Sequence, residues 1–196
     1  MDKTQTWLET QLGALLQTRG FKVVLNWSPP LGPDGNAGEV DVICARDGTV
    51  LVLEVKSTYL RRSQQDAWQH ETTTLRKAGL QMHRKVAAVQ QALADQPELA
   101  QRLGLETGAT ATNICGWIVD TSIECDHQRF CGFLKVSLEE LVIALRDDRH
   151  LLHDSDGLFA LPKSAADAAR RSLYPQGFSA CRLIEVVETQ AVWQGI

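Results

Sequence analysis

The stretch Gly38–Ser57, which reads GEVDVICARDGTVLVLEVKS, decides the fold of this 196-residue chain. Two mostly apolar runs flank Asp47-Gly48, a pair of residues that is typical of a tight hairpin turn. The stretch therefore predicts two antiparallel strands, over residues 39–45 and 49–57.

Three charged residues interrupt these apolar runs: Asp41, Glu54 and Lys56. Glu54 and Lys56 are two residues apart, so their side chains point to the same face of one strand, and the hairpin can bring Asp41 across to them. Burying such charges on an apolar sheet costs free energy unless they form ion pairs or bind a ligand. Two converging carboxylates suit a hard cation such as Mg²⁺, and a lysine beside it can orient water or stabilise developing negative charge. The alternative is a simple Glu–Lys pair on a solvated sheet face.

Asp41 followed by Glu54-Val55-Lys56 on the next strand resembles the PD-(D/E)XK, or restriction-endonuclease-like, nuclease superfamily. The Gly-Glu-Val-Asp lead-in is similar to the branch that contains nuclease-related domains and archaeal-type Holliday junction resolvases. Val40 stands where members of the superfamily can have a proline, at a variable position. The resemblance implies that Asp41, Glu54 and the Val55 carbonyl hold Mg²⁺, for which Mn²⁺ can substitute, and that Lys56 acts on the reacting phosphate.

The same resemblance implies two further site residues, Glu9 in the first helix and Gln81 in a long central helix. Glu9 would complete the metal site, but Thr6-Trp7-Leu8-Glu9 also fits a capping box in which Glu9 binds the Thr6 backbone. Gln81 would lie near the metal, with a solvated helix face as the alternative. Rival glutamines stand at Gln64, Gln65 and Gln90.

The other elements follow from hydrophobic periodicity and turn residues. We expect a helix at 5–19 closed by Gly20, a strand at 21–27, a helix at 64–94 with a break at Gly79, a short helix at 97–103, strands at 113–120 and 130–136, and a helix at 137–146. Within the long helix, the apolar face is expected at Leu80, Val86, Val89 and Leu93, and Arg84-Lys85 is expected on a solvated face.

This order predicts an α/β fold with the αβββαβ core of the resembled superfamily, a central mixed sheet flanked by helices. Residues 1–150 are expected to form the nuclease-like domain. Residues 151–196 are expected to form a small C-terminal α/β extension, with a helix at 164–173 and a strand at 183–188, which packs on the domain or joins it to a longer chain.

Composition narrows the class of protein further. The hydrophobic fraction of 44% is typical of a globular chain, no apolar run reaches the length of a membrane span, and the first residues lack the apolar segment of a signal peptide. Five cysteines without a CxxC pair suit reduced thiols, so a cytoplasmic protein is expected. A net charge of −4 argues against a protein that binds along DNA through overall positive charge. It is compatible with an acidic metal site.

The sequence thus predicts a Mg²⁺-dependent endo- or exodeoxyribonuclease that acts on DNA in defence, repair or recombination. Two alternatives stay open: an RNA nuclease, and a non-catalytic interaction module that retains the fold. A homodimer and a place in a larger assembly are both compatible with the sequence.

Overall fold

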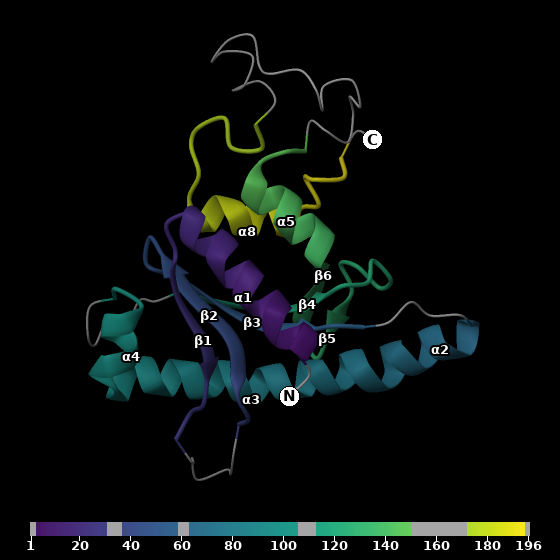
Figure 1. Cartoon of the computed structure of the whole chain (residues 1–196), viewed down its shortest axis with the longest axis horizontal. Helices are drawn as coiled ribbons and strands as arrows, with labels where there is room; N and C mark the ends of the chain where they lie inside the picture. The colour runs from purple at the N-terminus through teal and green to yellow at the C-terminus, as the bar shows by residue number, and fades with distance from the viewer. Residues whose placement is uncertain (1–2, 31–36, 59–62, 106–112, 150–171, 195–196) are drawn as a thin grey trace.

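A computed structural model describes residues 3–30, 37–58, 63–105, 113–149 and 172–194. In this part of the chain, helices cover both faces of a six-stranded mixed sheet (Figure 1). The chain is therefore an α/β protein.

The sheet is built around the predicted hairpin. The strands are β1 (Lys22–Trp27), β2 (Val40–Arg46), β3 (Thr49–Lys56), β4 (Asn113–Asp120), β5 (Arg129–Phe130) and β6 (Phe133–Ser137). They lie in the order β1-β2-β3-β4-β6-β5, in which β3, β4 and β6 are parallel and the other neighbours are antiparallel. Asp47 and Gly48 both have positive φ, 52° and 73°, as a two-residue type I′ turn requires. The hairpin prediction is confirmed.

The helices form a layer on each face of the sheet. They are α1 (Lys3–Thr18), α2 (Gln64–Gln69), the π-helix η1 (His70–Leu75), α3 (Arg76–Asp95), α4 (Pro97–Arg102), α5 (Leu138–Arg146) and α8 (Ala180–Glu188). The core under α1, α5 and α8 is separate from the core under η1, α3 and α4. None of the helices within the described ranges is both long enough and apolar enough to cross a membrane.

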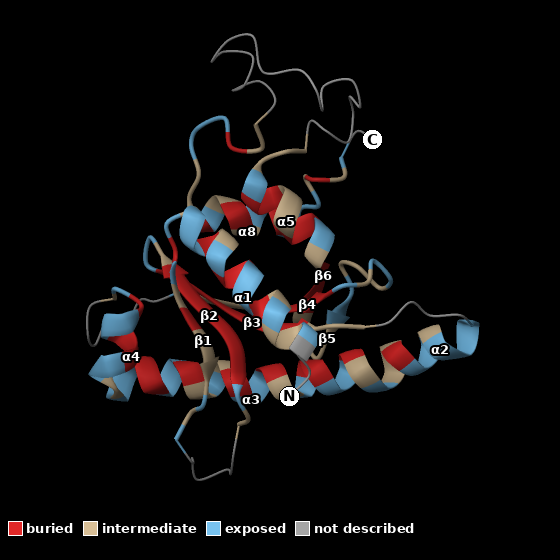
Figure 2. Ribbon diagram, viewed as in Figure 1, coloured by how far each residue is buried: buried red, intermediate tan, exposed pale blue. Residues whose placement is uncertain are grey.

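Side-chain alternation along the strands decides which residues face which layer. Val52 and Ile118 pack in the core that contains Met82 of α3, whereas Leu53 packs in the core that contains Leu16 of α1. The central strands are buried on both faces, as the red strands in Figure 2 show. Every second residue of β3, beginning at Val50, therefore faces the α3 layer.

The long helix differs from its prediction at two points. It continues through Gly79, where a break was expected, and its irregular turn is η1 instead. A Cβ atom at Gly79 would overlap the backbone carbonyl of Phe130. The glycine therefore permits close approach between α3 and β5, and the break predicted there is wrong.

The C-terminal strand predicted at 183–188 is also wrong, because these residues belong to α8. Ser179 caps the helix by accepting the Arg182 N–H at 3.3 Å. Leu183, Val186 and Val187 then recur at helical spacing and are buried in the core beside α1 and α5. Packing has overridden the strand propensity of the valines. The helix predicted at 164–173 lies, except for its last two residues, outside the described residues.

Candidate functional site

Asp41 and Glu54 lie side by side, at the start of β2 and near the end of β3. The ladder pairs Val42 with Leu53, and one further step places Asp41 opposite Glu54. Both residues are buried, with exposed fractions of 6% and 2%. Asp41 Oδ2 accepts a hydrogen bond from the Val55 N–H at 2.7 Å, which fixes the orientation of this carboxylate. The two carboxylates thus meet on one face of the sheet.

The Val55 backbone carbonyl faces the same edge of β3 as Asp41. The carbonyl of the next residue, Lys56, accepts the Thr121 N–H at 3.1 Å on the β4 side. Backbone groups of successive strand residues point to opposite sides, so Val55 turns both its N–H and its C=O towards β2. This carbonyl is therefore placed to act as a third oxygen donor.

Two lysines neutralise the two carboxylates. Lys56 Nζ lies 2.6 Å from Glu54 Oε1, and its side chain is 21% exposed. Lys85 Nζ, from α3, lies 3.1 Å from Asp41 Oδ1 and also pairs with Glu54 Oε2. The side chain of Lys85 is only 5% exposed. One buried ammonium therefore bridges Asp41 and Glu54, while a second reaches Glu54 from the solvent side.

Lys85 was not predicted as a site residue. The buried side of α3 includes Ala78, Met82, Lys85 and Val89, at helical spacing, whereas Leu80 is 54% exposed. The apolar face was therefore misplaced at Leu80. A lysine in register with buried small and apolar residues was the signal that could have identified Lys85.

Glu9 approaches the same cluster from α1. Its exposed fraction is 1%, and among the described residues neither carboxylate oxygen has a hydrogen bond of normal geometry. Burial raises the pKa of Glu9, a contact from Gln5 lowers it, and the nearby Asp41 carboxylate raises it again. Because α1 begins at Lys3, Thr6 lies inside the helix and the alternative capping box does not form.

The charges of the cluster alter one another's protonation. Burial raises the pKa of Asp41 and the Glu54 carboxylate adds to this, against the opposing effects of Lys85 and the Val55 N–H. Burial disfavours a charged Lys85, but Glu54 and Asp41 outweigh it, so the pKa of Lys85 is raised. The ammonium of Lys85 is thus stabilised by both carboxylates.

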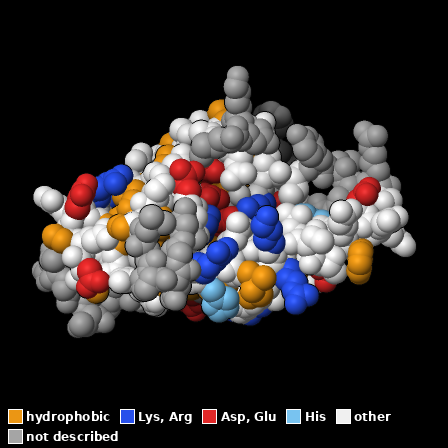
Figure 3. Space-filling view, turned by 90° about the horizontal axis from the view of Figure 1, so that it is seen from below, with side chains coloured by type: hydrophobic (Ala, Val, Ile, Leu, Met, Phe, Trp, Pro, Cys, Tyr) orange, Lys and Arg blue, Asp and Glu red, His pale blue; other side chains and the backbone are white. Residues whose placement is uncertain are grey.

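Gln81 lies one helical turn before Lys85. It lines a cavity of about 400 Å³ whose wall also includes Lys56. The structure therefore places Gln81 and Lys56 on the wall of one cavity, between α3 and the end of β3. Seen from below, the molecule shows several Lys and Arg side chains near the middle of the face, next to acidic side chains (Figure 3).

Three oxygen donors of the cluster are of the chemical type that binds divalent cations. Asp41, Glu54 and the Val55 carbonyl offer the oxygen ligands that Mg²⁺ and Mn²⁺ prefer. The Lys85 ammonium between these two carboxylates marks a position that already accommodates a cation. In the described part of the chain no three His, Cys, Asp or Glu side chains are grouped closely enough to hold a metal ion. Because Lys85 Nζ pairs with both Asp41 and Glu54, an ion held by these two carboxylates would have to displace it from at least one of them.

Comparison of the sequence with models of known protein families finds no match, and no curated protein is significantly similar to it. The functional interpretation therefore depends on the geometry of this cluster.

Proposed function

We propose that the protein is a metal-dependent phosphodiesterase with a restriction-endonuclease-like αβββαβ core, and that it cleaves DNA with Mg²⁺ or Mn²⁺. One observation carries the proposal: Asp41 and Glu54 meet on neighbouring strands, with the Lys56 ammonium 2.6 Å from Glu54. The arrangement of α1, β1, β2, β3, α3 and β4 supports the assignment of the core.

Asp41, Glu54 and the Val55 carbonyl would hold the ion. A divalent ion supplies Lewis acidity, which polarises a phosphodiester and makes water a better nucleophile. The Lys56 ammonium is held in place by Glu54 and is partly exposed, so it could contact a bound phosphate. It would offset the negative charge that develops on the phosphate oxygens during attack.

Lys85 and Glu9 would adjust the charge of the site. Lys85 occupies the cation position between Asp41 and Glu54 and would withdraw from at least one of them when an ion binds. A divalent ion near the buried carboxylate of Glu9 would add positive charge to that already supplied by Lys85, which lowers the cost of its burial.

A non-catalytic interaction module is the second candidate, and Lys85 favours it. A buried ammonium that pairs with both carboxylates neutralises the site without any ion. In this reading the cluster is a structural ion-pair network, and the fold serves to bind a partner. Metal binding and cleavage separate the two candidates.

The decisive experiment tests purified protein with Mg²⁺ or Mn²⁺ on linear, nicked, branched and single-stranded DNA, and on RNA. We expect cleavage by the wild type and at least a 100-fold loss in Lys56→Ala, the order of magnitude of removing one group that stabilises transition-state charge. The affinity of Lys56→Ala for a nucleic-acid strand should fall only modestly, by the contribution of about one phosphate contact. Lys22→Ala is the matched control, because Lys22 is exposed on β1 away from the cluster.

Two results would overturn the proposal. The first is a wild type that cuts none of these substrates with either ion. The second is equal cleavage by wild type and Lys56→Ala, which would trace the activity to another site or to a contaminant. Preferential cleavage of RNA would retain the reaction and reassign the substrate.

A further inference from the structure

The cavity beside Lys56 is lined by hydrogen-bond donors. Its lining residues are Lys56, Thr73, Thr74, Lys77 and Gln81. Of these described lining residues, two are cationic, three are neutral and none is acidic. The surrounding stretch 72–94 contains the exposed Arg76, Lys77 and Arg84 and no Asp or Glu, in a chain whose net charge is −4. The cavity is therefore suited to an anion.

Three of these donors have no partner among the residues that the structure describes. Within the described ranges, the side chains of Thr74, Lys77 and Gln81 make no hydrogen bond or ion pair, whereas the Thr73 hydroxyl donates to the Gln69 carbonyl. Donors that line a cavity without an internal partner are available to a ligand.

The π-helix η1 shapes one wall of the cavity. Thr73 and Thr74 belong to this wider turn, directly before α3 begins at Arg76. Single π-turns inside helices often occur at functional sites, because they redirect side chains that a regular helix would point elsewhere.

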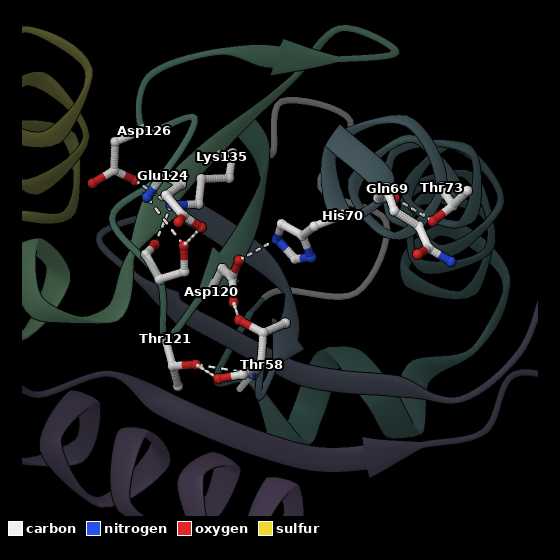
Figure 4. Close-up of polar contacts among 10 residues, drawn as sticks. Thr58, Gln69, His70, Thr73, Asp120, Thr121, Glu124, Asp126 and Lys135 are labelled. Atoms are coloured by element: carbon white, nitrogen blue, oxygen red, sulfur yellow. Dashed lines mark hydrogen bonds and ion pairs between the residues drawn. The ribbon is translucent and has the colours of Figure 1, made fainter. Parts of the chain in front are cut away.

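A buried polar network fastens η1 to the sheet. His70 Nε2 lies 2.8 Å from Asp120 Oδ2, and Asp120 Oδ1 accepts a hydrogen bond from the Thr58 hydroxyl at 2.8 Å (Figure 4). Asp120 ends β4 and is the strand partner of Lys56. The network therefore positions the π-turn relative to the end of β3, where Lys56 enters the cavity wall.

From this geometry we propose that the cavity is a phosphate-binding subsite for a nucleic-acid strand. It takes a backbone phosphate next to the one at Asp41 and Glu54, and Lys56 stands between the two positions. Lys77 supplies charge, while Thr74 and Gln81 supply neutral hydrogen bonds. The placement next to a cleaved bond rests on the proposed function, but phosphate binding in the cavity does not require cleavage.

Binding of a short fluorescent single strand in EDTA, measured by anisotropy over a range of salt, tests the subsite. Lys77→Gln should weaken binding and reduce the slope of log K against log[salt] by about 0.7, the value for one phosphate contact on a single strand. Thr74→Val should weaken binding and leave the slope unchanged, because it removes a neutral donor. Arg102→Gln, at an exposed position in the last turn of α4, is the control that should change neither quantity.

The source of the phosphate is tested by competition. DNA and RNA strands should displace the labelled strand much better than inorganic phosphate or a mononucleotide does at an equal concentration of phosphate groups. Equal competition by these small anions would overturn the strand assignment. Wild-type affinity and salt slope in both Lys77→Gln and Thr74→Val would overturn the subsite.

These outcomes are separable from those of the proposed function. If the wild type cuts nothing but Lys77→Gln alters binding as expected, the subsite stands and the nuclease proposal fails. If the wild type cleaves DNA and both variants bind as it does, the nuclease proposal stands and the subsite fails.

Discussion

Replacing Lys85 with methionine should destabilise the protein by about 3 kcal/mol at neutral pH. The Lys85 ammonium is buried between Asp41 and Glu54, and removing one partner of a buried ion pair typically costs about 3 to 5 kcal/mol. The lower value applies because Glu54 keeps its pair with Lys56 at 2.6 Å. For a chain of this size the melting temperature should fall by about 6 to 12 °C.

Thermal and chemical unfolding of matched variants would measure this effect. Lys77→Met is the control, because Lys77 is an exposed lysine on the same helix, and its change should stay within about 0.5 kcal/mol. Lys85→Met introduced into an Asp41→Asn/Glu54→Gln background should cost far less, since no buried charge is left uncompensated. An equal loss of stability in both backgrounds would refute the electrostatic explanation and assign the effect to packing.

Three further predictions concern metal, pH and packing. Mn²⁺ at 100 times its Kd should stabilise the wild type by about 2.7 kcal/mol, and the effect should vanish in Asp41→Ala; an equal effect in the variant would place the ion elsewhere. Because the folded pKa of Glu9 is raised above its ordinary 4.5, stability is lost as pH rises through that folded value. Glu9→Gln should therefore be more stable than wild type at pH 7 and equal to it below the ordinary pKa, and parallel pH–stability curves would contradict this. Gly79→Ala should destabilise, because overlap with the Phe130 carbonyl costs about 1 to 3 kcal/mol, more than the gain of about 1 kcal/mol in helix propensity; a higher melting temperature would show that α3 can shift away from β5.

Short-range features of the chain were predictable from sequence. The turn at Asp47-Gly48 needs two residues that tolerate positive φ, and the alternation of strand side chains depends only on spacing. Gly20 closes α1 with φ of +79°, as its place after the apolar stripe indicated. The hairpin and the meeting of Asp41 with Glu54 follow from these local rules.

Long-range contacts decided the rest. Lys85 pairs with Asp41, which lies 44 positions earlier in the chain. The position of Lys85 within α3 does not reveal which charged residues of the sheet it will contact. The burial of Glu9 arises in the same way, where α1 packs beside the end of the hairpin. In α8, residues with strand propensity became helical because the core beside α5 accepts their apolar face. The burial of a charge and the choice between helix and strand both depend on partners that only the folded chain brings together.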